Sequence, residues 1–174
     1  MGETVGETVR LGYSAEFADV HEAVRVRLRA TRWWPAMRWT TRIVGGFAVL
    51  VAGLALWIGD AGAAVTLVLL GAVAVGAAEL IPWGTAWSLF RLIGSQGDAT
   101  AVVDEDGGRW TSRDTDTTIR WALLPRYVET PRLFVLLTAQ RSGTGFAYLP
   151  KRGLADPADV DRLRAVLDRY TARA

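Results

Sequence analysis

The stretch AAVTLVLLGAVAVGAAELIP, residues 63–82, is almost entirely apolar and carries one charged residue, Glu79. A helix rises about 1.5 Å per residue, so about 20 such residues cross the hydrocarbon core of a bilayer, which is about 30 Å thick. A second apolar stretch, IVGGFAVLVAGLALWI at residues 43–58, is a little short unless residues 39–42 extend it. We therefore predict a membrane segment at residues 39–87 with two transmembrane helices, at 39–58 and 63–83.

Only GDAG, residues 59–62, separates the two apolar stretches. A connection this short makes the helices a hairpin, which leaves both chain ends on one side of the membrane. Six arginines and no acid lie between residues 25 and 42, whereas the connection carries Asp60 alone. By the positive-inside rule, we expect an integral protein of the bacterial cytoplasmic membrane with both termini in the cytoplasm.

Glu79 is the acidic side chain inside the second apolar stretch, and its depth suggests a partner. With the turn centred between Asp60 and Ala61, Glu79 lies at the depth of Arg42. A charge near the interface costs less than one at the helix centre, where the cost is about 2.5–3.5 kcal/mol. The sequence predicts an intramembrane ion pair between Arg42 and Glu79, with snorkelling and a proton or substrate pathway as alternatives. Small residues also allow the helices to pack as a hairpin, to form a homodimer or to bind another membrane protein.

The N-terminal segment, residues 1–38, changes from a strand pattern to a helix pattern. Residues 9–13 alternate apolar with other side chains, and from Ser14 onward apolar residues recur at helical spacing. Another face of this helix carries three arginines, Arg25, Arg29 and Arg32. This face is a candidate contact for anionic lipid head groups; the alternative is a helix packed on the soluble domain with its arginines in solvent.

A linker predicted at residues 88–98 leads into a β-rich region, residues 99–174. Its hairpin signal DEDGG, residues 104–108, is followed by β-branched and aromatic runs separated by proline and glycine. The chain ends in an amphipathic helix after Asp156. The expected fold is membrane α+β: a transmembrane hairpin followed by a small cytoplasmic antiparallel meander of about six strands, closed by the C-terminal helix.

These features resemble one known family. The matching residues are Ile119, Trp121, Glu129, Thr130, Phe134, the step Leu149-Pro150-Lys151-Arg152 and the terminal helix. Together with the hairpin that precedes them, they are similar to the YcxB-like membrane proteins. The resemblance implies a pleckstrin-homology-like fold for residues 99–174 and the topology given above. It brings no activity and no catalytic residues to this chain.

Lys151 and Arg152 are the sharpest part of this resemblance. They follow a strand that ends at Pro150 and precede a helix capped by Asp156, so we expect an exposed connection. The two cations are a candidate contact for anionic lipid or for an acidic partner. The alternative is a solvated hinge whose cations pair with Asp156 or Asp159.

Composition and motifs give little support to catalysis. The chain has no cysteine, and its single histidine, His21, has no neighbouring nucleophile and is expected on the surface. DEDGG lacks the ligand spacing of a calcium loop, and no glycine-rich phosphate loop is present. We expect no enzymatic activity, no cofactor and no metal site. The net charge of +2 is too small to indicate nucleic acid binding.

The function that the sequence favours is a membrane-anchored, non-enzymatic adaptor or sensor. It would hold the C-terminal domain at the cytoplasmic leaflet, where the domain binds a protein, a peptide or an anionic lipid. One alternative is an accessory or self-protection subunit of a membrane transporter, and another is an enzyme whose site the sequence does not reveal. The identity of the partner discriminates between the first two.

Overall fold

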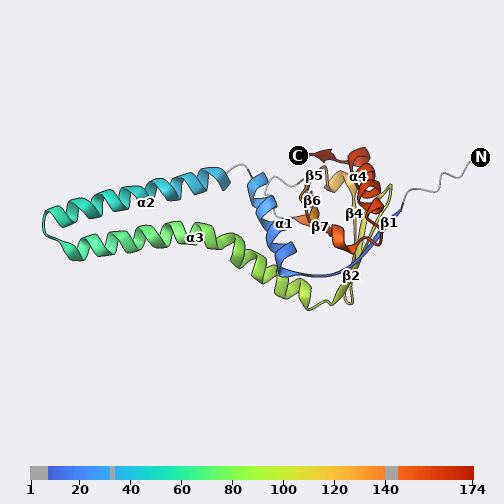
Figure 1. Cartoon of the computed structure of the whole chain (residues 1–174), viewed down its shortest axis with the longest axis horizontal. Helices are drawn as coiled ribbons and strands as arrows, with labels where there is room; N and C mark the ends of the chain where they lie inside the picture. Colours follow the sequence, from blue (N-terminus) through green and yellow to red (C-terminus); the bar gives the residue numbers. More distant parts are fainter. Residues whose placement is uncertain (1–7, 32–33, 140–144) are drawn as a thin grey trace, which may run out of the picture. The chain divides into compact units, whose positions relative to one another are not determined.

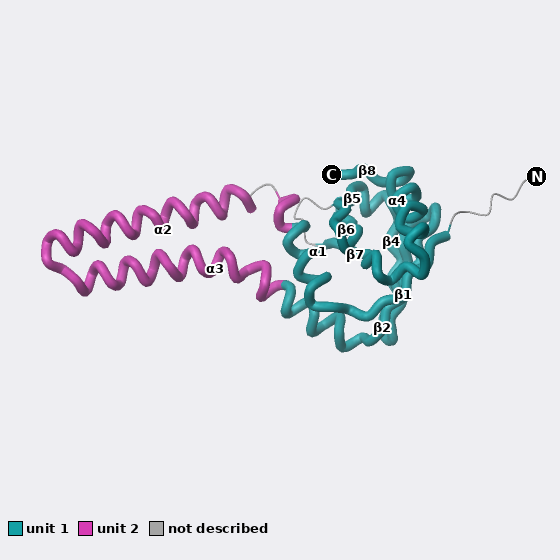
Figure 2. The backbone as a smooth tube through the Cα atoms, viewed as in Figure 1, with its two compact units in different colours: residues 1–27, 86–174 teal, residues 28–85 magenta. Residues whose placement is uncertain are grey.

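The computed structural model describes residues 8–31, 34–139 and 145–174. In this part of the chain, four α-helices and two four-stranded sheets give an α+β fold (Figure 1). The chain divides into two compact units, which Figure 2 distinguishes by colour. One is the hairpin unit, residues 28–85, and the other is the sheet unit, residues 1–27 with 86–174. The sheet unit is therefore assembled from both ends of the chain.

The hairpin unit contains one long apolar helix and most of a second one, whose last residues, 86–94, belong to the sheet unit. Helix α2 runs Trp34–Trp57 and helix α3 runs Ala61–Gly94, and each is long and apolar enough to cross a membrane. The Asp60 carboxylate stabilises the start of α3 by accepting a hydrogen bond from the Ala63 backbone N–H at 2.9 Å. Large apolar side chains lie exposed along both helices, and Leu50 for example is 73% exposed.

Small residues allow α2 and α3 to approach each other closely. Ala52 and Ala55 of α2 are buried in one cluster with Ala64 of α3. At Gly45, an added Cβ would lie only 2.7 Å from the Val75 Cγ2 atom. A side chain at residue 45 would therefore force Val75 or the two helices to shift.

Both helices are longer than the sequence patterns indicated. Helix α2 begins at Trp34 rather than at residue 39. The linker expected from residue 88 is wrong for residues 88–94, which belong to α3. Apolar side chains continue at helical spacing in this segment, with Leu89 and Ile93 one turn apart, so the helix has a face to bury beyond the apolar stretch.

The C-terminal end of α3 packs against helix α1, Phe17–Ala30. The Phe17 ring lies edge-on to the rings of Trp87 and Phe90, with centroid distances of 5.8 and 5.9 Å. Val20 and Val24 on α1 are fully buried. The amphipathic helix predicted from Ser14 onward therefore packs within the sheet unit.

The sheet unit contains two sheets. The first is antiparallel with the order β1-β2-β3-β4, and its strands are β1 (Val9–Ser14), β2 (Asp98–Val103), β3 (Gly107–Thr111) and β4 (Asp116–Arg120). The second has the order β7-β6-β5-β8, and its strands are β5 (Arg126–Glu129), β6 (Leu133–Leu137), β7 (Phe146–Pro150) and β8 (Ala172–Arg173). The expected six-stranded meander becomes eight strands over the described residues, because β1 pairs with β2 and the short β8 pairs in parallel with β5.

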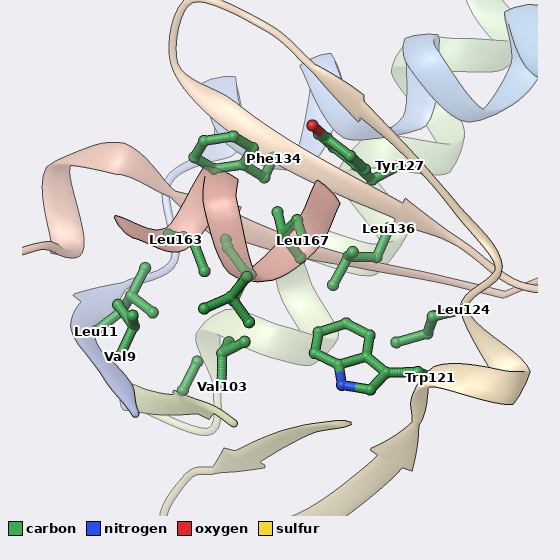
Figure 3. Close-up of a cluster of buried hydrophobic side chains, with 13 residues drawn as sticks. Val9, Leu11, Val103, Trp121, Leu124, Tyr127, Phe134, Leu136, Leu163 and Leu167 are labelled. Carbon is green, nitrogen blue, oxygen red and sulfur yellow. The ribbon is translucent and has the colours of Figure 1, made fainter. Parts of the chain in front are cut away.

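The core of the sheet unit joins both sheets to the terminal helix α4, Ala158–Tyr170 (Figure 3). Leu11 of β1, Leu136 of β6 and Leu163 of α4 are each at most 1% exposed. Trp121 stacks on Tyr170 of α4 at a centroid distance of 5.7 Å. The apolar stripe of the terminal helix thus closes the core, as its spacing predicts.

Candidate functional site

Lys151 lies in the short 3₁₀ turn η2, Lys151–Gly153, directly after β7. Its Nζ atom is 2.8 Å from Glu129 Oε1 and 4.9 Å from the centroid of the Phe134 ring. The Lys151 side chain is only 19% exposed. The expectation of a solvent-facing cation is therefore wrong for Lys151, because a carboxylate and an aromatic ring within the chain already surround its ammonium group.

Glu129 is the centre of the charged cluster that contains Lys151. Its carboxylate also lies 2.7 Å from Arg164 of α4 and 3.1 Å from Arg173 of β8. Its side chain is 10% exposed, and hydrogen bonds, from Arg164 above all and then from Lys151, lower the pKa of Glu129 to about 2. This carboxylate therefore remains ionised and links four elements, β5, η2, α4 and β8.

Arg152 is also paired within the chain rather than exposed for a ligand. It forms an ion pair with Asp19 of α1, a second one with Glu16 at 3.1 Å, and donates a hydrogen bond to the Ser14 carbonyl oxygen at 2.6 Å. Asp19 is 1% exposed and also pairs with Arg132 at 2.9 Å. The predicted partners Asp156 and Asp159 are wrong for Arg152, since its actual partners, Ser14, Glu16 and Asp19, come from the N-terminal segment, far away in sequence.

The basic face of α1 is only partly within the described residues. Arg25 and Arg29 are exposed, and no ion pair involves them in the described part of the chain. Between them, Arg27 lies 5.7 Å from the centroid of the Phe146 ring, and partial burial lowers its pKa. Arg32 lies outside the described residues. Lipid contact by Arg25 and Arg29 stays a prediction.

The structure brings Arg42 and Glu79 together, but a second arginine lies closer. Glu79 Oε1 is 3.9 Å from Arg42 Nη2 and 3.1 Å from Arg38 Nη2. Arg38 precedes Arg42 by about one helical turn, so both reach the same carboxylate from one face of α2. A comparison of depths along the hairpin cannot distinguish two residues one turn apart, which is why Arg38 was missed.

The remaining polar motifs have structural partners. In the predicted hairpin tip, Asp104 Oδ1 accepts hydrogen bonds from the backbone N–H groups of Asp106 and Gly107 at 3.0 and 3.1 Å. His21 stacks on Phe17 with a centroid distance of 5.8 Å. Among residues 8–31, 34–139 and 145–174, no group of three or more histidine or acidic side chains is placed to hold a metal ion.

The sheet unit also contains a pocket of about 330 Å³ that the sequence did not indicate. It is lined chiefly by apolar and aromatic side chains, among them Tyr13, Leu89, Ile93, Trp110, Ile119 and Tyr148. These residues come from β1, α3, β3, β4 and β7, so only the folded unit brings them together. Strand alternation over residues 9–13 placed Tyr13 on the apolar face of its strand, but it could not reveal a space beside that face.

A comparison with known proteins identifies part of this unit. Residues 103–167 match the family model described as YcxB-like protein. The match runs from the last residue of β2 into α4, and the resemblance predicted from the sequence is confirmed over that range. Searches of curated proteins and of solved structures found no match. The chain therefore carries a YcxB-like domain over residues 103–167, preceded by two apolar helices that are long enough to span a membrane.

Proposed function

We propose that this chain is a membrane-anchored, non-enzymatic adaptor or sensor of the bacterial cytoplasmic membrane. The hairpin unit serves as the anchor, and the sheet unit with its YcxB-like domain is held at the cytoplasmic leaflet to bind a partner. Support for the anchor comes from the large apolar side chains that α2 and α3 leave exposed, such as Trp57 at 84% and Val73 at 67%. A bilayer removes such surface from water. The backbone polar groups of a helix are hydrogen-bonded within the helix, so this transfer leaves few of them unpaired.

The pairing of β1 with β2 is the observation that best supports the proposed membrane topology. Val9 and Leu11, before the hairpin, lie in register with Val103 and Ala101, after it. Two segments of one sheet must lie on the same side of any membrane, so the chain between them crosses an even number of times. The two helices α2 and α3 satisfy this condition, and the arginines that precede α2 favour the cytoplasmic side.

The arrangement of polar groups in the sheet unit supports a role in binding rather than in catalysis. The buried carboxylate of Asp19 and the largely buried one of Glu129 are each paired with two or more cations within the chain. The pocket, in contrast, is walled mainly by apolar groups, as ligand-binding sites usually are. Arg25 and Arg29 are available on α1 for an anionic lipid head group or an acidic partner surface.

Site-directed labelling tests the anchor and its orientation. The chain has no cysteine, so the single variants Asp60→Cys and Ala165→Cys each offer one thiol, the first between the helices and the second on an exposed position of α4. In bacterial spheroplasts, we expect a membrane-impermeant maleimide to label Asp60→Cys, and to label Ala165→Cys only after lysis. We also expect the chain to remain in the membrane fraction after alkaline extraction.

Two results would contradict this proposal. Release of the chain by alkaline extraction would mean that the hairpin is not integrated. Labelling of Ala165→Cys in intact spheroplasts would place the sheet unit on the outer side. The wild-type chain, which has no thiol, controls for non-specific labelling.

A further inference from the structure

Within the described residues, the two sheets of the sheet unit have four edges, and three of these edges are covered or short. The free edge of β1 meets the turn η2, where Arg152 donates a hydrogen bond to the Ser14 carbonyl oxygen at 2.6 Å. On β7, the Tyr148 carbonyl oxygen lies 3.5 Å from the Tyr13 hydroxyl group. Strand β8 has only two residues. Covered and short edges prevent further strand pairing, so β4 is the edge that remains open to it.

The backbone groups on the outer side of β4 have no partner among the described residues. Alternate residues of an antiparallel strand bond to opposite sides, and the hydrogen bond from the Ser112 N–H to the Thr115 carbonyl oxygen sets this alternation between β3 and β4. Thr117 and Ile119 therefore bond to β3. The N–H and C=O groups that point away from β3 belong to Asp116, Thr118 and Arg120. None of these groups forms a hydrogen bond with the described part of the chain.

Strand β4 has the sequence DTTIR, which is complementary in charge to a second copy of itself. When two such strands pair antiparallel about Thr118, Asp116 of each copy lies opposite Arg120 of the other. In that register, the outward N–H and C=O groups of the two strands face each other as in an antiparallel ladder. Cross-strand pairs of opposite charge, and of threonine with threonine, stabilise a sheet, whereas a shift by two residues would separate the charges.

The two charged residues of β4 are available for such a contact. Arg120 is exposed, and no ion pair involves it in the described part of the chain. Asp116 pairs with Arg109 of β3, and the hydrogen bond from Arg109 lowers the pKa of Asp116, so its carboxylate stays ionised. The Asp116 side chain is still 46% exposed, which leaves room for a second cation. Two arginines already share one carboxylate in this unit, at Asp19.

We propose that β4 pairs antiparallel with β4 of a second copy of this chain, which joins two four-stranded sheets into the continuous sheet of a homodimer. The contact uses five residues of each copy, so it buries less surface than a stable soluble dimer needs. A membrane anchor offsets this weakness, because it confines the copies to two dimensions and raises their effective concentration. The inference goes beyond the proposed function, which concerns a single copy, and the register of the pairing does not rest on the anchor.

Disulfide crosslinking of the full chain in isolated membranes tests the pairing. The chain has no cysteine, so Thr118→Cys places one thiol at the symmetry axis, where paired Cα atoms about 5.5 Å apart suit a disulfide. Thr100→Cys is the matched control, because Thr100 is an exposed threonine of β2, which lies two strands away from β4. With copper phenanthroline as the oxidant, we expect Thr118→Cys to form disulfide-linked dimers about ten-fold faster than Thr100→Cys.

Charge reversal in the Thr118→Cys background tests the register. Arg120→Glu places two carboxylates opposite each other in a pair of like copies, and Asp116→Lys places two cations there, so each variant alone should crosslink several-fold more slowly than its parent. A mixture of the two variants, with different affinity tags, should recover crosslinking between unlike copies, because each carboxylate then faces a cation. Arg120→Glu keeps the pair of Asp116 with Arg109, so its result holds even where Asp116→Lys disturbs the fold.

Several outcomes would overturn the inference. Equal rates for Thr118→Cys and Thr100→Cys would mean that the copies meet only by collision or through α2 and α3. Crosslinking that Arg120→Glu leaves unchanged would mean that these charges do not set the register. A disulfide-independent adduct cannot arise at the single thiol, so an adduct of Thr118→Cys with a different protein, and none between copies, would assign the edge to another partner. None of these results bears on alkaline extraction or maleimide labelling, so the proposed anchor can fail or hold separately.

Discussion

At the scale of single residues, two carboxylates, one buried and one largely buried, join separate elements of the sheet unit. Glu129 of β5 contacts cations from η2, α4 and β8, and Asp19 of α1 contacts Arg132 and Arg152. Removal of either carboxylate leaves several partly buried cations close together without their counter-ion, which costs more than the loss of an exposed pair. The stability of the unit should therefore depend strongly on these carboxylates.

Glu129 should make the stability of the chain depend on pH. Its folded-state pKa of about 2 lies below the ordinary value of 4.5, so its ionised form contributes stability that is complete above about pH 4.5 and is lost as the pH falls toward 2. Glu129→Gln should lower the free energy of unfolding by about 3 kcal/mol at pH 7. The difference between wild type and variant should shrink as the pH falls from 5 to 2, measured by urea unfolding in detergent micelles.

Asp161→Asn is the control for this measurement. Asp161 also pairs with Arg164, but its side chain is 79% exposed, so we expect a loss below about 1 kcal/mol. Equal losses for the two variants, or a difference that stays constant over the pH range, would show that Glu129 is not the dominant group.

At the scale of the elements, the long apolar helices and the terminal helix were predictable, because each has an unbroken run or stripe of apolar residues. The short strand β8 was not, since two residues give no pattern and its pairing with β5 depends on where α4 ends. The pairs of Lys151 with Glu129 and of Arg152 with Asp19 left no local signal either. The sequence therefore identified the two cations, and ion pairing as one of their possible roles, but not their partners.

Packing between α2 and α3 offers a second prediction. An added side chain at Gly45 would meet Val75 at 2.7 Å, whereas at the adjacent Gly46 it would meet nothing within 4 Å. Gly45→Leu should therefore lower the stability of the hairpin unit by about 1–3 kcal/mol, as overpacking of a tight contact usually does. Gly46→Leu, the matched control, should be neutral. Thermal unfolding in detergent micelles measures both variants, and equal behaviour would contradict the close approach of the helices.

At the scale of the whole molecule, the sheet unit is discontinuous in sequence. The family match covers residues 103–167, yet β1 and α1 come from residues before the hairpin unit. Leu11 of β1 is 1% exposed in the core, and β1 covers an edge of β2 that would otherwise be unpaired. The segment recognised as YcxB-like is therefore only part of the unit that folds.

A fragment of residues 97–174 should not fold on its own. It lacks β1 and α1, so it exposes apolar core surface and the edge of β2, and we expect aggregation and a poorly dispersed NMR spectrum. A chain in which a flexible glycine-serine linker replaces residues 32–85 keeps both parts of the unit and should give a dispersed spectrum. A well-dispersed spectrum from residues 97–174 alone would contradict the structural role of β1.

The discontinuity also sets an order for biosynthesis. Strand β1 leaves the ribosome before α2 and α3, and its partner β2 leaves only after them. Strand β1 therefore stays unpaired while the hairpin unit is synthesised. In the proposed topology, a chain that inserts only one of the two helices would place β1 and β2 in different compartments. Completion of the sheet then acts as a proofreading step, because only correctly inserted chains can bury Leu11, and misinserted ones keep an open strand edge for proteases to attack.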